Sequence, residues 1–278
     1  MTEPGGARPV GGRAQDRSRF LEQMGNELAG WEDPASRLKR ALERDELVLY
    51  AQPVVSLRGP LQYPFAEVLV RLLEEETALL PPGEFLPAFE HYGMMPQLDR
   101  WVVRHASERL ARGSRVPRLS INVSAQSLGD AEFVPFVAGA LEQARLAPDA
   151  LIFELDESDV LARPDAAARF AAALKARGGG VLLDGFGQRS VSFAPLTSLR
   201  PDFVKVDGII VRKLASSEVA RSKLNAIVRV GDVIGAGIIG ECVEQQEVLD
   251  ALKAARAGYA QGFGLRRPAP LEEIAAGS

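Results

Sequence analysis

From Pro34 onward, the chain alternates short apolar runs with longer segments whose apolar residues recur at helical spacing. Many of the apolar runs are nearly continuous, as in parallel strands that helices cover. This pattern predicts eight strands, at 47–57, 65–72, 119–123, 151–155, 180–184, 203–206, 238–242 and 259–262. It predicts helices between them, including 98–112, 133–144, 164–177, 216–234 and 245–256.

Repeated strand–helix units indicate the α/β class, and eight of them most simply close into a (β/α)₈ TIM barrel. A doubly wound open sheet is the alternative, although no GxGxxG follows the first strand. We therefore predict a single barrel domain over 34–278. Residues 1–33 are rich in Gly, Pro and Arg, which predicts a disordered N-terminal arm with a short helix near 20–28.

Composition narrows the function. A chain of 278 residues with 46% hydrophobic residues can bury the core of one barrel, and its net charge of −4 disfavours a nucleic acid polymer as partner. No apolar run reaches the length of a membrane span, and the N-terminus lacks a secretory signal, so we expect a cytoplasmic protein. With one Cys and two His, any metal must be held mainly by oxygen, which suits Mg²⁺, Mn²⁺ or Ca²⁺.

Polar residues lie at or near the ends of most predicted strands. They are Glu67, Asn122, Glu154, Asp184, Lys205 with Asp207, Glu241 with Glu244, and Gln261. Any one of them could be a helix cap or a solvated side chain, but in a barrel they would converge on one mouth. Carboxylates that meet there repel one another unless a cation neutralises them, so the set indicates metal-assisted hydrolysis of a phosphate ester. Neither His91 nor His105 lies at a strand end, which argues against a Ser/His triad.

Eight short motifs carry a family resemblance. They are AQPVV at 51–55, FAEVLVR at 65–71, INVS at 121–124, FELDES at 153–158, LDGFG at 183–187, FVKVDG at 203–208, GECVE at 240–244 and AQGFGL at 260–265. Over about 34–270 the chain resembles the EAL domain family in motif order and spacing. The resemblance implies a modified TIM barrel that binds cyclic di-GMP. In active members it implies hydrolysis to pGpG with Mg²⁺ or Mn²⁺, inhibition of turnover by Ca²⁺, and a homodimer.

The resemblance also implies roles for individual residues. Ligands of the first metal would be Glu67, Asn122, Glu154 and Asp184. Lys205 would orient the attacking water, and Glu241 would act as general base or as a metal-linked acid. The dinucleotide would contact Gln52, Arg71 and Gln261. Support for the site would come from Glu157, Asp207 and Glu244.

Several positions depart from the family pattern. Active members carry a second aspartate, which helps to hold a second metal, where this chain has Gly185. The loop 187–192 differs from the usual GTGYSS-like sequence, and Cys242 replaces a preferred glycine beside Glu241. Val68 in place of alanine is a milder change, since valine suits a strand.

Two functional hypotheses follow. The first is a metal-dependent cyclic di-GMP phosphodiesterase of reduced activity, which the nearly complete acidic site favours. The second is a non-catalytic receptor that senses cyclic di-GMP or binds a protein partner, which Gly185 and the altered loop favour. With no cyclase-like segment before the barrel, we expect regulation through the N-terminal arm, dimerisation or a separate protein. An HD-type phosphodiesterase is disfavoured because paired His-Asp ligands are absent.

Overall fold

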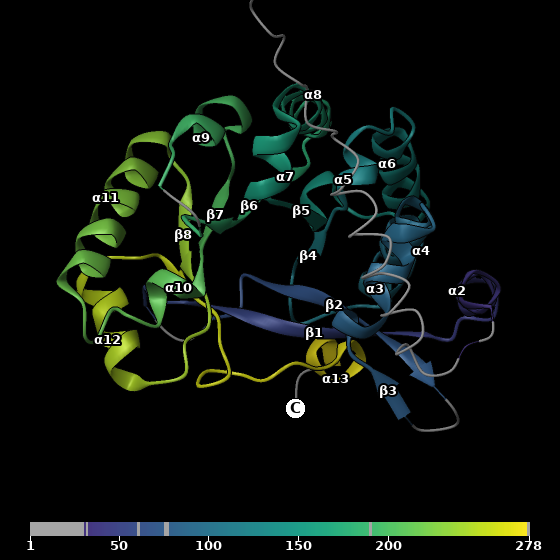
Figure 1. Cartoon of the computed structure of the whole chain (residues 1–278), viewed down its shortest axis with the longest axis horizontal. Helices are drawn as coiled ribbons and strands as arrows, with labels where there is room; N and C mark the ends of the chain where they lie inside the picture. Colours follow the sequence, from purple (N-terminus) through teal and green to yellow (C-terminus); the bar gives the residue numbers. More distant parts are fainter. Residues whose placement is uncertain (1–30, 32, 60–61, 75–77, 189–190, 277–278) are drawn as a thin grey trace, which may run out of the picture.

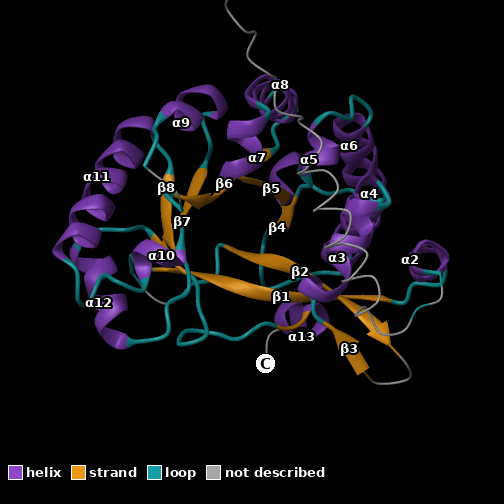
Figure 2. Ribbon diagram, viewed as in Figure 1, coloured by secondary structure: helices purple, strands orange, loops and turns teal. Residues whose placement is uncertain are grey.

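Eight strands close into a barrel in the computed structural model, which describes residues 31, 33–59, 62–74, 78–188 and 191–276. Figures 1 and 2 show the strands in the centre with helices around them. The barrel strands are β1 (Leu47–Ser56), β2 (Phe65–Glu74), β4 (Leu119–Asn122), β5 (Leu151–Asp156), β6 (Gly180–Phe186), β7 (Phe203–Val206), β8 (Gly237–Gly240) and β9 (Tyr259–Ala260). They pair in that order and β9 pairs back to β1, so the barrel prediction is confirmed and the open sheet is excluded.

The first strand runs against the others. β1 pairs antiparallel with β2 and with β9, whereas the remaining neighbours in the barrel are parallel. The link from Ser56 to Phe65 is too short for a crossover helix, so β1 and β2 form a hairpin. This makes the fold a modified TIM barrel. The sequence pattern did not predict two short strands, β3 (Ala78–Leu80) and β10 (Ala269–Pro270). They pair antiparallel with β2 and β1, respectively.

The helices cover the outside of the barrel. They are α2 (Pro34–Glu43), α3 (Pro82–His91), α4 (Met95–Ala111), α5 (Ala125–Leu128), α6 (Phe133–Gln143), η1 (Pro148–Ala150), α7 (Glu157–Ala162), α8 (Pro164–Lys175), α9 (Ala194–Leu199), α10 (Gly208–Val211), α11 (Glu218–Ile234), α12 (Gln246–Ala254) and α13 (Leu271–Ala276). The five helices predicted by range are all present. The helix predicted near 20–28 lies outside the described residues. No helix in the described ranges is long and apolar enough to cross a membrane.

Three short helices begin directly after barrel strands, and polar residues at the strand ends start them. Ser124 caps α5, Asp156 caps α7 and Asp207 caps α10, each by accepting a hydrogen bond from a backbone N–H in the first turn. Asp207 therefore has the role of an N-cap. These caps turn the chain away from the barrel mouth at the end of each strand.

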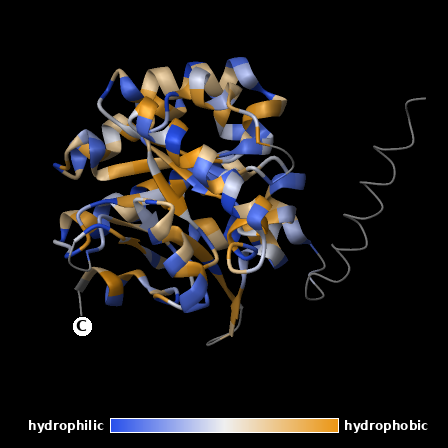
Figure 3. Ribbon diagram, turned by 90° about the vertical axis from the view of Figure 1, so that its left-hand side faces the viewer, coloured by the Kyte–Doolittle hydropathy of each residue, from blue (hydrophilic) through white to orange (hydrophobic). Residues whose placement is uncertain are grey.

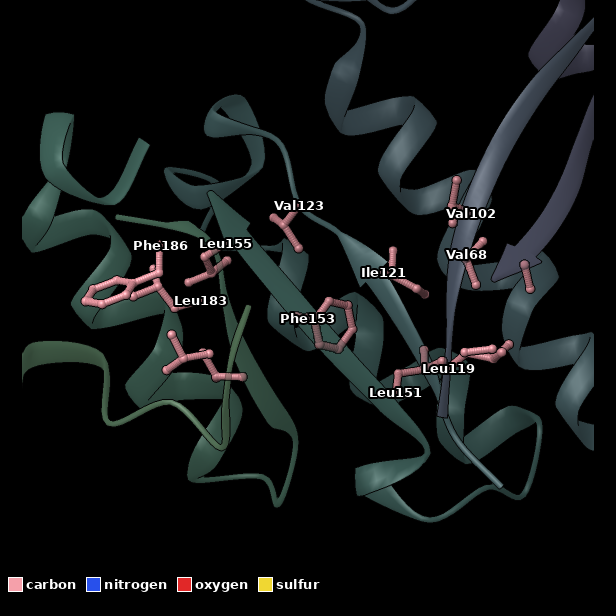
Figure 4. Close-up of a cluster of buried hydrophobic side chains, with 14 of the residues drawn as sticks. Val68, Val102, Leu119, Ile121, Val123, Leu151, Phe153, Leu155, Leu183 and Phe186 are labelled. Carbon is pink, nitrogen blue, oxygen red and sulfur yellow. The ribbon is translucent and has the colours of Figure 1, made fainter. Parts of the chain in front are cut away.

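Two apolar clusters build the core. The larger one lies between strands and helices, and Figure 4 shows outward-facing side chains such as Ile121 and Phe153 within it. The smaller one consists of Val54, Phe65, Ile152, Leu182, Phe203 and Ile239. Figure 3 shows the corresponding concentration of hydrophobic residues along the central strands. The smaller cluster fills the barrel interior and forms a floor beneath its mouth.

Close backbone packing joins the loops after β8 and β9. Val243 N–H donates to the Gln261 carbonyl at 3.0 Å, and a Cβ added to Gly262 would lie 2.1 Å from the Val243 carbonyl oxygen.

We expect Gly262→Ala to lower the free energy of unfolding by at least about 3 kcal/mol, the upper end of the cost of overpacking. Chemical denaturation would measure the change. Gly139→Ala, on the exposed face of α6 with no atom within 4 Å of the added Cβ, should instead raise stability by about 0.5–1 kcal/mol. Equal effects of the two substitutions would contradict this account.

Candidate active site

A polar layer lies directly above the apolar floor. Side chains two residues apart on a strand share a face, so the residues two positions toward the mouth from the floor residues also point into the barrel. For Val54, Phe65, Ile152, Leu182, Phe203 and Ile239 these neighbours are Gln52, Glu67, Glu154, Asp184, Lys205 and Glu241. The strands thus switch from apolar to polar at one level, and this switch places the candidate site at the mouth.

Lys205 occupies the centre of this layer. Its Nζ lies 2.5 Å from Glu154 Oε2, 3.0 Å from Glu67 Oε2 and 3.5 Å from Asp184 Oδ1. The Lys205 side chain is only 2% exposed and that of Glu154 is fully buried. Side chains from four strands, β2, β5, β6 and β7, thereby meet at one ammonium group. The four residues predicted from separate motifs do come together.

Glu67 is the most densely hydrogen-bonded carboxylate of the site. Its Oε1 accepts from Asn122 Nδ2 at 3.0 Å, while its Oε2 accepts from Lys205 Nζ and from Gln261 Nε2 at 2.9 Å. Burial opposes ionisation of Glu67, but Lys205 and the two amide donors outweigh burial and hold the pKa of Glu67 below its usual value. Glu67 is therefore ionised and fixed in position.

The other two carboxyl groups of the layer, Glu154 and Asp184, resist ionisation. Burial, and then the charge of Glu67, raises the pKa of Glu154 to about 8, and burial also raises the pKa of Asp184. Burial would lower the pKa of Lys205, but the surrounding carboxylates hold it well above its usual value. One ammonium thus faces three carboxyl groups, so Glu154 retains its proton at neutral pH unless a further positive charge is present.

A divalent cation would favour ionisation of all three carboxyl groups, and the donor set suits one. Glu154 Oε1 and Asp184 Oδ1 are buried and have no hydrogen-bond partner among the described residues. Within those same residues, no three His, Cys, Asp or Glu side chains lie close enough together to hold a metal ion. Lys205 lies between the three carboxylates and contacts each of them. Carboxylate and amide oxygens are the ligands that Mg²⁺ and Mn²⁺ prefer. The residues present therefore fit such a cation.

Glu241 extends the site on the side of β8. Its Oε1 accepts a hydrogen bond from Gly208 N at 2.7 Å, which ties it to the start of α10. Burial, and then the charge of Asp184, raises the pKa of Glu241 to about 7. Next to it, Cys242 has φ +56°, a left-handed conformation that favours glycine, and a Cβ on Gly208 would lie 2.8 Å from Cys242 Sγ. The cysteine thus fills the space between the loop after β8 and α10.

The loop after β6 is held by Glu157 through the backbone. Glu157 Oε2 accepts from Gly187 N at 3.0 Å, and the Glu157 side chain is buried with Oε1 unpaired in the described structure. Gly185 and Gly187 have φ of +65° and +86°, so the chain turns sharply there. Burial is the main reason that the pKa of Glu157 is raised. Residues 189–190 of this altered loop lie outside the described part.

The predicted dinucleotide contacts divide into two groups. Gln52 pairs in register with Glu67, so it lies beside the carboxylates, and its Nε2 donates to the Arg266 carbonyl at 2.9 Å. Arg71 shares the face of Glu67 on β2 but lies nearer the rim, with its guanidinium 5.4 Å from the ring centre of Tyr50. Glu244 is exposed, and its backbone carbonyl oxygen lies 2.5 Å from where a Cβ on Gly264 would be, so its support of the site stays a prediction.

Sequence reasoning missed Asp99 on helix α4. This buried carboxylate accepts hydrogen bonds from Ser124 N at 3.0 Å, Ser124 Oγ at 2.6 Å and Ser127 Oγ at 2.7 Å. It thereby fixes the loop that follows Asn122. An aspartate on the buried face of a predicted amphipathic helix was the available signal, since buried acids need partners.

Comparison with known proteins decides the family. The EAL domain model matches residues 35–268. The chain belongs to the EAL domain family. The EAL domain described here is 32% identical over 240 residues to cyclic di-GMP phosphodiesterase PdeB of Shewanella oneidensis, covering 85% of this chain and 28% of PdeB. It spans about a third of the length of the curated relatives that it matches first.

Two solved structures are similar in both sequence and fold. One is the PaMucR phosphodiesterase in complex with c-di-GMP, at 32% identity and TM-score 0.78, covering 86% of this chain and 98% of that one. The other is the FimX EAL domain of Pseudomonas aeruginosa bound to c-di-GMP, at 31% identity and TM-score 0.79, covering 87% and 98%. Both therefore share the modified TIM barrel over nearly their full length.

Proposed function

We propose that this EAL domain binds cyclic di-GMP at the barrel mouth and hydrolyses it to pGpG with Mg²⁺ or Mn²⁺. The observation that carries the proposal is the polar layer, in which Glu67, Glu154 and Asp184 surround Lys205 at 2.5–3.5 Å. Relatives named cyclic di-GMP phosphodiesterases and structural neighbours with bound c-di-GMP supply the substrate class. We expect Ca²⁺ to inhibit turnover.

The cation would be held by Glu67, Asn122, Glu154 and Asp184. When bound, it supplies charge stabilisation for the phosphoryl group and a more acidic water. Lys205 adds a fixed positive charge, because Glu67 and Glu154 hold its ammonium in one place. Such a preorganised donor can position the attacking water and stabilise the charge that develops on the phosphoryl oxygens.

Substrate contacts would come from the rim and from the polar layer. Arg71 can pair with a phosphate through its guanidinium, while Gln52 and Gln261 lie beside Glu67. Calorimetry with cyclic di-GMP in Ca²⁺ tests this step without turnover. We expect Arg71→Ala to weaken binding at least about 10-fold, the effect of losing roughly 1.4 kcal/mol. If wild type shows no binding heat or saturation, the ligand assignment is wrong.

Glu241 would accept the proton of the attacking water. A base acts only when deprotonated, and burial raises the pKa of Glu241 to about 7. We therefore expect kcat/KM to rise with pH through about 7 and then to level off. Glu241→Gln should remove this limb and reduce the rate by about 10²–10⁴-fold. Glu247→Gln, on the exposed first turn of α12, should retain the rise of kcat/KM with pH. A variant Glu241→Gln with an unchanged pH profile would assign the proton to another group.

We propose reduced activity because of two features, one near the end of β6 and one in the loop after it. Gly185 leaves the strand end without a second consecutive acid, and the loop that follows departs from the family sequence. In a two-metal site, losing one ligand weakens stabilisation of the attacking or leaving oxygen. Gly185 also favours a second candidate function, a catalytically inactive receptor that binds cyclic di-GMP or a protein partner.

Assembly and location are part of the same proposal. The family resemblance supports a homodimer and a regulatory protein partner. The paucity of Cys supports a cytoplasmic location. Sedimentation of the purified chain with and without cyclic di-GMP would measure the oligomeric state.

A further inference from the structure

Asp156 lies in the polar mouth, although no motif assigns it a role there. It is the last residue of β5, two positions beyond Glu154 on the same inner face, and its partner in register on β6 is Asp184. The carboxylates of Asp156 and Asp184 are therefore neighbours on adjacent strands. Both lie nearer the mouth than the buried carboxylate of Glu154.

The side chain of Asp156 faces the space that Gly185 leaves open. A Cβ added to Gly185 would lie 3.5 Å from Asp156 Oδ2, an ordinary contact distance. A carboxylate on residue 185 would thus begin in the space that the Asp156 carboxylate already faces. Asp156 and an aspartate at position 185 would start from different strands, but their carboxylates would face the same space.

Asp156 is held so that one oxygen is available. Its Oδ1 accepts from Ser158 N at 2.7 Å and from Ser158 Oγ, which caps α7. Its Oδ2 accepts no hydrogen bond from any described residue. The capping bonds restrict the rotamer at little cost, so Oδ2 is preorganised for a ligand.

The buried oxygens that support a cation in the polar layer lie next to Asp156 along the strands β5 and β6. Glu154 is 1% exposed and its Oε1 has no hydrogen-bond partner in the described ranges, and the same holds for the buried Oδ1 of Asp184. Buried polar atoms are normally paired, and the protein supplies Asp184 Oδ1 only with the Lys205 ammonium at 3.5 Å. A hard divalent cation satisfies carboxylate oxygens of this kind.

We propose that Asp156 acts with Asp184 to hold a second divalent cation and so replaces the acid that is absent at Gly185. The inference rests on the proposed function of the site. Because Oδ1 remains bound to Ser158, Asp156 offers a single oxygen.

Binding of Mn²⁺ alone to the full chain tests the proposal, with free Mn²⁺ measured by electron paramagnetic resonance. We expect wild type to bind two ions per chain. Asp156→Asn retains the cap, since asparagine caps helices as well as aspartate does, but removes the charge. It should bind the second ion at least about 10-fold more weakly. Asp33→Asn, which changes the exposed aspartate that caps α2, is the matched control and should bind as wild type does.

Moving the acid provides a rescue. In the Asp156→Asn background, Gly185→Asp should restore the second ion, because aspartate tolerates the left-handed conformation at φ +65°. Gly185→Ala in that background introduces a side chain at the same φ without a carboxylate and should restore nothing. Rescue by aspartate and not by alanine supports the proposal.

Two results would overturn the proposal: a single Mn²⁺ site in wild type, or two sites of unchanged affinity in Asp156→Asn. Failure of the proposed function has a different signature. If wild type binds two ions that depend on Asp156 but forms no pGpG, the phosphodiesterase assignment fails and the cation site stands. If pGpG forms while Asp156→Asn binds Mn²⁺ as wild type does, the phosphodiesterase assignment stands and the role of Asp156 fails.

Discussion

Lys205→Met is expected to abolish measurable hydrolysis, with kcat reduced by about 10²–10³-fold or more. The substitution removes the ammonium that lies 2.5 Å from Glu154 Oε2 and 3.0 Å from Glu67 Oε2, and it leaves three carboxylates facing one another. Removing one partner of a buried ion pair typically costs about 3–5 kcal/mol of stability, and we expect a loss of that size here. Denaturant unfolding and a pGpG assay measure the two effects.

A second lysine in the chain provides the control. Lys175 Nζ lies 3.0 Å from Asp202 Oδ1, but both side chains are partly exposed, at 31% and 45%. Exposed ion pairs contribute at most about 1 kcal/mol, so Lys175→Met should change stability little and activity not at all. If Lys205→Met were as stable and as active as Lys175→Met, the ammonium would have no role at the centre of the site.

Glu67→Gln should reduce kcat by about 10³-fold, which corresponds to a loss of roughly 4 kcal/mol of transition-state stabilisation. Both oxygens of Glu67 accept hydrogen bonds, from Asn122 on one side and from Lys205 and Gln261 on the other. A glutamine has only one acceptor oxygen, so its NH₂ group must face at least one of these donors. The substitution would also remove a charged ligand of the proposed cation.

The affinity for Mn²⁺ distinguishes these effects from general damage. We expect Glu67→Gln to bind Mn²⁺ at least about 10-fold more weakly than wild type. Glu272→Gln is the matched control, because Glu272 pairs with Arg109 at 2.6 Å on α13 and is 68% exposed. It should retain wild-type activity and Mn²⁺ affinity. Unchanged Mn²⁺ affinity in Glu67→Gln would remove Glu67 from the ligand set.

The sequence pattern predicts the strands well and their directions less well. All eight barrel strands lie within two residues of their predicted ranges, because buried strands have a strong apolar signal. The antiparallel direction of β1 was not predicted, since apolar runs carry no information on direction. The short 57–64 link was the available indication of a hairpin.

The candidate site shows the same limit. Strand-end polar residues were predicted to converge, and Glu67, Asn122, Glu154, Asp184 and Lys205 do so. The central position of Lys205 was not predictable, because its contact with Glu67 joins residues 138 positions apart and depends on barrel closure. Likewise, the proximity of Asp156 to Gly185 follows from the register of β5 with β6.

The most direct test of the central claim is to incubate the purified wild-type chain with cyclic di-GMP and Mn²⁺ or Mg²⁺ and follow pGpG by chromatography. Parallel calorimetry in Ca²⁺ reports binding alone. We predict slow formation of pGpG that requires Mn²⁺ or Mg²⁺ and stops in Ca²⁺. Tight binding of cyclic di-GMP with no pGpG, even at high enzyme concentration, would contradict the phosphodiesterase assignment and favour the non-catalytic receptor.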